Sequence, residues 1–234
     1  MDRTDAMAGA APRLVIFDMD GTLIDSEALI CGCMDAAFIA AGHTAPGAAA
    51  TRRIVGLSLP IAIARLAPAL DEAARAAVTA HYKNAFTRVR ADVGDAAAAP
   101  MFPGARAALD RIAGGGALMA VATGKARRGL ERVLDAHDLR GFFTTTQSAD
   151  DAPSKPHPGM VLNALQATGG AAARAVVVGD SAYDIEMARA AGVAAIGVSW
   201  GVHPAQALRD AGAAAIIDSF AALDAALARL GLAA

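Results

Sequence analysis

Short apolar runs recur along this chain, and each ends in a small polar turn that precedes a helix-like segment. The runs cover residues 14–17, 117–122, 175–178, 194–198 and 214–217. They are continuously apolar, which is typical of strands in a parallel sheet whose two faces are both covered by helices. The alternation of strand and helix therefore predicts an α/β fold, with a doubly wound, Rossmann-like parallel sheet.

One long stretch interrupts this alternation. Residues 26–99 contain helical patterns only, at 27–41, 59–66 and 71–89. Stretches with Gly and Pro at 42–50 and 93–103 are the predicted joints of this insert. We therefore expect two domains, which are a catalytic core of residues 12–25 and 100–234 and an inserted all-helical domain of residues 26–99. Helices of the core are expected at 103–113, 125–137, 158–168, 181–191, 203–211 and 220–230.

Composition excludes several classes of protein. With 55% hydrophobic residues and a net charge of -2, the chain is neither a disordered polymer nor a basic protein drawn to nucleic acid or anionic membranes. It has no uncharged apolar stretch of about 18 residues, and residues 1–12 lack the apolar segment of a secretion signal. We therefore expect a cytoplasmic protein, with residues 1–12 as a frayed tail. Among its 21 basic residues only three are Lys, namely Lys83, Lys125 and Lys155.

Polar side chains stand where the predicted strands end. Asp18 and Asp20 follow the first strand, Thr123 follows the second, and Asp180 follows the third, with Asp184 one helical turn later. Ligands of open parallel sheets bind outside these carboxyl ends. Each motif alone is an ordinary turn or helix cap, but their joint occurrence in this order favours a site.

The residue types at these ends suit phosphate chemistry. Several carboxylates gathered at the carboxyl ends of the strands repel each other, and a hard cation such as Mg²⁺ relieves that repulsion. A metal, the Lys155 ammonium and the Thr123 hydroxyl would then surround one phosphate, which a carboxylate can attack. Asp20 lies close enough to Asp18 to act as acid and base at the same centre.

These motifs resemble those of the haloacid-dehalogenase-like hydrolase superfamily. The first motif is the segment FDMDGTL at residues 17–23, and the insert resembles the helical cap of that superfamily. Thr123 matches the second motif, Lys155 the third, and Gly179-Asp180 with Asp184 the fourth. The segment GVSWG at 197–201, with His203-Pro204, resembles the branch that contains phosphoglycolate phosphatases and β-phosphoglucomutases.

The resemblance implies a role for each catalytic residue. Asp18 would be the nucleophile that forms an aspartyl-phosphate, and Asp20 would protonate the leaving alcohol and then activate water. Thr123 would donate a hydrogen bond to the phosphoryl oxygens, and Lys155 would offset the negative charge. The expected activity is a Mg²⁺-dependent phosphatase that hydrolyses a small phosphomonoester such as 2-phosphoglycolate or a sugar phosphate, acting as a monomer or homodimer.

The resemblance also implies the metal ligands and substrate contacts. Mg²⁺ would be bound by Asp180, Asp18 and the backbone carbonyl of Asp20, whereas Asp184 would bind it through water or orient its partners. The cap loop at residues 52–58 is expected to select the substrate, although its arginines could equally be an exposed helix-end pair. The expected substrate contacts are Gly21, Thr22, Gly124, Arg52, Arg53 and Gly56.

Three alternatives to a phosphatase can be compared with this sequence, namely a dehalogenase, a mutase and a receiver module. Haloacid dehalogenases lack the second aspartate of the first motif, so the presence of Asp20 argues against that reaction. β-Phosphoglucomutases carry a cap histidine twelve residues after the nucleophile, where this chain has Ile30. A two-component receiver module also combines aspartates, Thr and Lys, but it is about half as long and has its phospho-acceptor on a middle strand.

Overall fold

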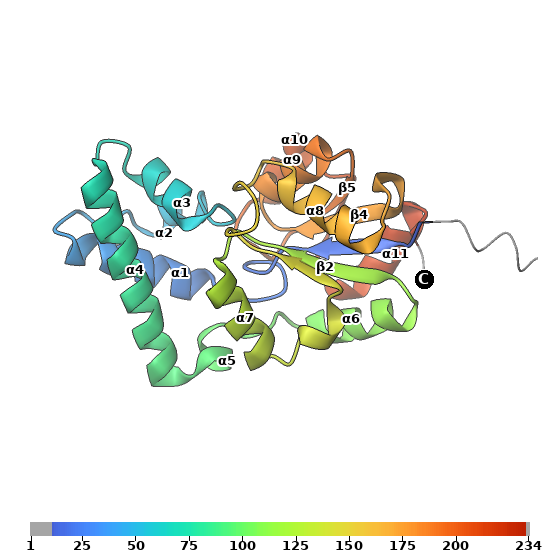
Figure 1. Ribbon diagram of the computed structural model, residues 1–234, viewed down its shortest axis with the longest axis horizontal. Helices are drawn as coiled ribbons and strands as arrows, with labels where there is room; N and C mark the ends of the chain where they lie inside the picture. Colours follow the sequence, from blue (N-terminus) through green and yellow to red (C-terminus); the bar gives the residue numbers. More distant parts are fainter. Residues whose placement is uncertain (1–10, 233–234) are drawn as a thin grey trace, which may run out of the picture.

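The computed structural model describes residues 11–232, so almost all of the expected tail and the last two residues of the expected core lie outside the described part. A six-stranded sheet forms the centre of the larger domain, with strand order β3-β2-β1-β4-β5-β6 and parallel pairing throughout (Figure 1). The strands are β1 (Leu14–Phe17), β2 (Leu118–Ala122), β3 (Thr145–Gln147), β4 (Ala175–Gly179), β5 (Ala194–Val198) and β6 (Ala215–Ile217). The predicted doubly wound fold is confirmed.

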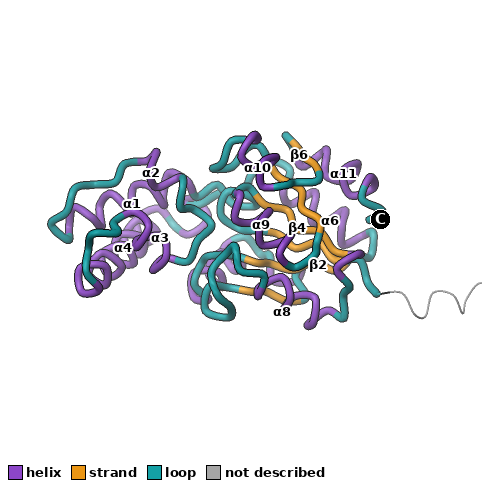
Figure 2. Tube along the Cα trace, turned by 90° about the horizontal axis from the view of Figure 1, so that it is seen from above, coloured by secondary structure: helices purple, strands orange, loops and turns teal. Residues whose placement is uncertain are grey.

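Helices cover both faces of this sheet, as Figure 2 shows. Because side chains alternate along a strand, Val15 and Phe17 of β1 join one buried cluster, whereas Leu14 and Ile16 join the other. The first cluster is completed by α6 (Ala105–Gly114), α7 (Arg127–Ala136) and α11 (Leu223–Arg229). The second cluster is completed by α8 (Gly159–Thr168), α9 (Ala182–Ala190) and α10 (Ala205–Ala211).

The insert is helical within its described length, and it lies beyond one end of the sheet (Figure 1). It has a small core of its own, built around Met34, Phe38, Ile63 and Val78. Its helices are α1 (Glu27–Ala40), α2 (Ala48–Arg52), α3 (Leu59–Leu66), α4 (Glu72–Val93) and α5 (Asp95–Ala98). Helices α2 and α5 fall in the stretches expected to be joints, because runs of Ala favour a helical turn even beside Gly and Pro.

The two crossings between the sheet domain and the insert lie side by side. The amide of Asp25 donates to the carbonyl of Pro100 at 2.8 Å, and the amide of Phe102 donates to the carbonyl of Leu23 at 3.0 Å. Ile24 and Met101 form an antiparallel bridge between these bonds. The helical insert is therefore tied to the sheet through a short paired link of residues 23–25 and 100–102.

The edge strand β3 is the one strand of the described sheet that the sequence pattern did not predict. Its sequence, Thr-Thr-Gln, is polar and short, and it extends the sheet only by pairing with β2. Within residues 11–232, none of the helices combines the length and the apolar character needed to cross a bilayer.

Candidate active site

The strand ends bring the predicted residues together. Phe17 at the end of β1 pairs with Val121 of β2 and Val178 of β4, so the residues that follow these strands meet at one edge. The polar residues gathered there are almost completely removed from solvent, with exposed fractions of 0–1% for Asp18, Thr123, Lys155, Asp180 and Asp184. Burial of so many ionisable groups is costly unless they are paired, so their mutual contacts determine the chemistry of the site.

Lys155 bridges two of the carboxylates. Its Nζ lies 2.9 Å from Oδ1 of Asp18 and 2.5 Å from Oδ1 of Asp184. Burial alone would lower the pKa of Lys155, but the charges of Asp18 and Asp184 outweigh burial and raise that pKa above its ordinary value. Lys155 is therefore a fixed cation between the predicted nucleophile and the start of α9.

Three carboxylates in this site have more negative charge than Lys155 can balance. Asp18, Asp180 and Asp184 each offer an oxygen within 4.8 Å of the others. Burial raises the pKa of Asp18 well above its usual range; the charge of Lys155 opposes this shift, and the charges of Asp184 and Asp180 add to it. Burial and the charge of Asp184 likewise raise the pKa of Asp180 to about 7. Among the described residues, Oδ2 of Asp18 has no hydrogen-bond partner. The residues present therefore fit a divalent cation, which would relieve this repulsion.

Asp180 and Asp184 are held by different contacts. Asp180 accepts hydrogen bonds from the Thr22 hydroxyl at 2.9 Å and from the Val202 amide at 2.9 Å. Asp184 accepts from the amide and the hydroxyl of Ser181, at 3.1 and 2.6 Å, in a capping box that begins α9. Lys155 and Ser181 thus engage the two oxygens of Asp184, which stays predicted to bind the metal through water or to orient its partners.

Asp20 stands apart from the acidic cluster. Its Oδ1 accepts a 2.7 Å hydrogen bond from Ser26, and its Oδ2 lies 3.0 Å from Nζ of Lys125. From the sequence, Lys125 follows Thr123-Gly124 at a predicted helix start, where a solvated side chain and one near the phosphate are the two alternatives. The structure pairs it with the predicted acid–base group. Its position after the second motif and the scarcity of Lys in the chain were the signals that pointed to it.

Glycines allow the backbone to approach the site closely. A Cβ on Gly21, whose φ is +85°, would lie 2.2 Å from Oδ2 of Asp180. A Cβ on Gly124 would lie 2.4 Å from the carbonyl oxygen of Gly56, which belongs to the cap loop. Gly56 itself has φ +97° and packs on Ser181. The structure thus brings the loop between α2 and α3 directly onto the ends of β2 and β4.

A cavity of about 340 Å³ lies between the insert and the sheet domain. Asp18, Asp20 and Thr123 line its floor, and residues Val55, Gly56 and Leu57 of the cap loop line it from the insert. The remaining apolar lining is Ile30, Met34, Ile54, Leu59, Ala62, Tyr82 and Phe86.

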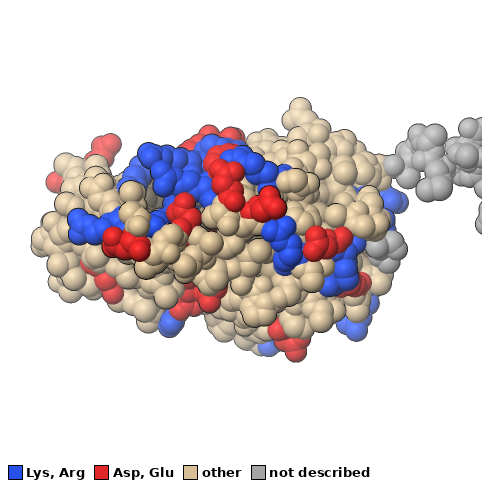
Figure 3. Space-filling view, turned by 90° about the horizontal axis from the view of Figure 1, so that it is seen from below, with Lys and Arg blue, Asp and Glu red and all other residues tan. Residues whose placement is uncertain are grey.

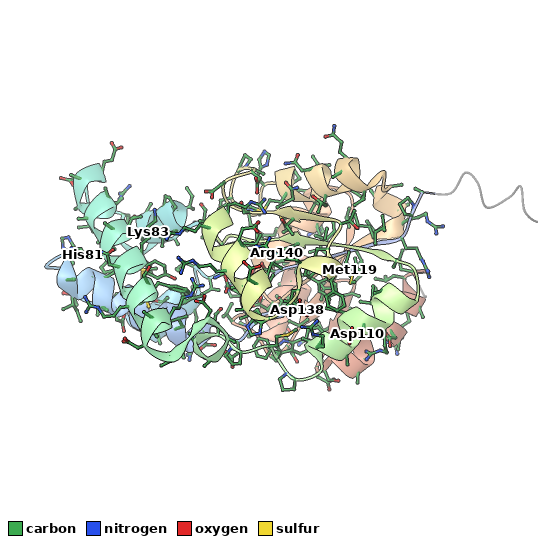
Figure 4. All side chains as sticks on the ribbon, turned by 60° about the horizontal axis from the view of Figure 1, so that its bottom comes forward. His81, Lys83, Asp110, Met119, Asp138 and Arg140 are labelled. Carbon is green, nitrogen blue, oxygen red and sulfur yellow. The ribbon has the colours of Figure 1, made fainter. Side chains whose placement is uncertain are left out.

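The predicted cap arginines do not line this cavity. Arg52 instead pairs with Glu27 at 2.6 Å, and the carbonyl of Arg53 accepts a hydrogen bond from Tyr183. The basic residues that do line it came from no sequence motif, and they are Lys83, Arg90, Lys125, Arg128 and Arg132. Lys83 stands on the side of α4 toward the sheet domain, whereas His81 stands on the opposite side (Figure 4).

Comparison with known proteins agrees with this site. Residues 15–198 match the family model described as haloacid dehalogenase-like hydrolase. The chain belongs to this family. A Dickeya dadantii protein named "Probable phosphatase IndB" is 37% identical over 88% of this chain and 90% of its own length. A phosphoglycolate phosphatase of Pseudomonas syringae is 30% identical over 93% of this chain and 80% of its own.

Solved structures agree on the fold. A haloacid dehalogenase-like hydrolase from Bacteroides fragilis superposes with a TM-score of 0.82, at 24% identity, covering 91% of this chain and 99% of that one. The family-model match confirms the predicted superfamily, and the relatives place this hydrolase among the phosphatases of the family. Its ligands and the roles of its individual residues stay predictions.

Proposed function

We propose that this hydrolase is a Mg²⁺-dependent phosphatase that cleaves a small phosphomonoester in the cytoplasm, as a monomer or homodimer, through an aspartyl-phosphate. The observation that carries the proposal is the arrangement of Asp18. This carboxylate lines the cavity floor, is paired with Lys155 on one oxygen, and has a second oxygen without a partner among the described residues. A fixed carboxylate that faces an accessible cavity is suited to nucleophilic attack.

In the first step a carboxylate oxygen of Asp18 bonds to phosphorus while the bond from phosphorus to the ester oxygen breaks. Asp20 donates a proton to the departing alkoxide, because its carboxyl lines the same floor. Asp20 then takes a proton from the water that hydrolyses the acyl-phosphate. Ser26 and Lys125 hold the Asp20 carboxyl in place for both transfers.

The cation belongs beside Asp18 and Asp180, where the buried negative charge is least compensated. When bound, Mg²⁺ would supply positive charge to the phosphoryl oxygens and hold the phosphate beside the nucleophile. The carbonyl of Asp20 and a water-mediated contact from Asp184 stay the predicted further ligands.

The phosphoryl oxygens are then contacted by groups of the sheet domain. The Thr123 hydroxyl lies at the cavity floor, and Lys155 counters the charge of the Asp18 side. Backbone amides beside Gly21, Thr22 and Gly124 are the proposed further donors. For the substrate itself, 2-phosphoglycolate and sugar phosphates stay the proposed compounds, because relatives of this chain are named phosphoglycolate phosphatases.

The mutase alternative lacks support at the position that distinguishes it. A mutase needs a proton acceptor on the cap to activate the second sugar hydroxyl, and Ile30 contributes an apolar surface to the cavity wall at that position. Hydrolysis needs no such group, because Asp20 can serve both steps.

A panel of phosphomonoesters, assayed with and without Mg²⁺, tests the proposed function. Asp18→Asn is expected to abolish phosphate release, because an amide oxygen is a poor nucleophile. Asp110→Asn, at an exposed position on α6, is the matched control and should retain full activity. Equal phosphate release by the Asp18→Asn variant and the wild type would disprove the mechanism.

A further inference from the structure

The wall of the cavity formed by α4 and α7 is basic. Lys83 and Arg90 come from α4, and Arg128 and Arg132 come from α7. Lys and Arg side chains gather at the junction of the insert and the sheet domain in the view of Figure 3. The carboxylates in the cavity lining lie at its floor, where Asp20 is already paired with Lys125. The α4–α7 wall, defined here as these four residues, therefore has positive charge to offer a ligand.

Arg90 is the most constrained of the four. Its Nε donates to Asp95, its guanidinium lies 5.6 Å from the centre of the Phe86 ring, and its side chain is only 10% exposed. Its Nη2 is buried and has no hydrogen-bond partner among the described residues. A buried donor without an acceptor costs roughly 1–3 kcal/mol. An anchored guanidinium with a donor left over is suited to an acceptor that arrives with the ligand.

Two of the three arginines of α7, Arg128 and Arg132, are also left without compensation. Arg128 and Arg132 are four residues apart, so they share one face of the helix, where like charges repel. Glu131 lies between them in the sequence, but its carboxylate pairs with Arg127 and Arg140. Within residues 11–232, neither Arg128 nor Arg132 forms an ion pair. An anion against this face would relieve the repulsion.

The rest of the cavity is apolar and large. Its volume of about 340 Å³ falls within the range of roughly 300–1,000 Å³ that is typical of pockets for drug-sized ligands. A phosphorylated two-carbon acid would leave most of that apolar surface uncovered. Helix α7 begins just after the end of β2 and rises about 1.5 Å per residue, so Arg132 lies farther from the floor than Arg128 does.

We propose that the substrate is a phosphomonoester with an apolar body of ring size and a second, distal oxyanion, which Arg90 and Arg132 bind. This inference rests on the proposed phosphatase function and, among small phosphomonoesters, favours larger substrates over 2-phosphoglycolate, which has no such apolar body. The phosphoryl group would lie at Asp18, the apolar body against Met34, Ile54 and their neighbours, and the oxyanion on the α4–α7 wall.

Two ligands that differ only in the distal anion provide the test, namely phenyl phosphate and 4-carboxyphenyl phosphate. Their dissociation constants are measured by calorimetry with Mg²⁺ and the Asp18→Asn variant, in which the ester stays intact. The carboxylated ester should bind about tenfold tighter, as expected for charge-assisted hydrogen bonds in a half-buried site. Adding Arg132→Gln or Arg90→Gln should remove most of this preference and leave the affinity for phenyl phosphate unchanged. Arg174→Gln, at an exposed position before β4, is the matched control and should keep the preference.

The outcomes separate the two proposals. Equal affinity for the two esters, or equal weakening of both by Arg132→Gln, would overturn the distal site. Arg132→Gln keeps the test decisive if Arg90→Gln disturbs the contact with Asp95. The Asp18→Asn variant could prefer the carboxylated ester, and lose that preference with Arg132→Gln, while the wild-type protein releases phosphate from neither ester. That result would support the distal site and overturn the phosphatase function.

Discussion

Two charged regions of the site balance their charge differently. One is the floor of the cavity, taken here together with the buried Lys155, Asp180 and Asp184 that adjoin it. The other is the α4–α7 wall. At the floor, Lys155 lies between Asp18 and Asp184, and all three side chains are buried and in direct contact. On the wall, Arg90 keeps a buried donor without a partner, and Arg132 has no ion pair among the described residues. The side chains of the floor are therefore fixed by their own contacts and leave negative charge for a cation, whereas the wall leaves positive charge and a free donor for the substrate.

This difference assigns separate tasks to the two regions. Preorganised charges stabilise a transition state without the cost of reorganisation, which suits the reacting phosphoryl group. Uncompensated cations contribute mainly to ligand affinity, and their loss leaves the fold intact. Substitutions at the floor should therefore change both stability and turnover, whereas substitutions on the wall should change substrate binding.

The largest effect is expected from Lys155→Met. Removing the ammonium leaves the carboxylates of Asp18 and Asp184 buried and unpaired, which should lower the free energy of unfolding by about 3–5 kcal/mol. Turnover should be lost as well. Lys83→Met, on the exposed part of the wall, is the control and should change the unfolding free energy by less than about 0.5 kcal/mol. Similar denaturation midpoints in urea for the two variants would contradict the contrast between the regions.

The buried carboxyl groups of the floor should make the stability of the protein depend on pH, whereas the arginines of the wall stay charged. The pKa of Asp180 is about 7 in the folded protein, above the value of 3.8 that applies without burial. Because the folded protein holds the Asp180 proton more tightly than the unfolded chain does, the free energy of unfolding is highest below about pH 4. This contribution is lost as pH rises through 7. The metal-free protein should lose up to about 1.4 kcal/mol of unfolding free energy per pH unit in this window. Asp180→Asn should reduce the slope without abolishing it, because the raised pKa of Asp18 acts in the same direction, and an unchanged slope in that variant would exclude Asp180 as a cause.

Much of the fold and floor was predictable from the sequence because the signals are local. A continuous apolar run followed by Asp18 or Asp180 indicates both a buried strand and a polar residue at its carboxyl end. Strand β3 was not predicted, because Thr145-Thr146-Gln147 has no apolar run. It becomes a strand only by pairing with β2, which is distant in the sequence. The order of the strands likewise has no local signal.

The wall could not be predicted, because it forms between helices that are distant in sequence. Arg90 on α4 and Arg132 on α7 meet at one cavity only after the insert packs against the sheet domain. Spacing offered one hint, since Lys83, Thr87 and Arg90 lie on one face of a helix and all line the cavity. The pair Arg52 and Arg53 was a stronger sequence signal, yet their side chains lie outside the cavity lining.

Gly124→Ala should move the cap loop away from the floor of the cavity. The new methyl group would lie 2.4 Å from the carbonyl oxygen of Gly56 and 2.7 Å from that of Leu57, so the cap loop must move away. Such overpacking costs roughly 1–3 kcal/mol, and if the whole cost is met on closure of the cap loop kcat/KM should fall by about fivefold to 150-fold. Gly141→Ala is the control, because a Cβ there meets nothing within 4 Å. Unchanged kcat/KM in Gly124→Ala would show that the cap loop does not need this close approach.

Tyr183→Phe should have the smallest effect and should act on closure of the insert. The Tyr183 hydroxyl donates to the carbonyl of Arg53 at 2.8 Å and accepts from Arg65 at 3.0 Å, so it joins α9 to the insert. Phenylalanine keeps the ring under the Arg65 guanidinium but removes both hydrogen bonds, which are worth about 1 kcal/mol each at a partly exposed site. KM should rise several-fold while kcat changes little, because Asp18 and Lys155 are untouched. A fall in kcat at constant KM would instead place Tyr183 with the floor, through its neighbour Asp184.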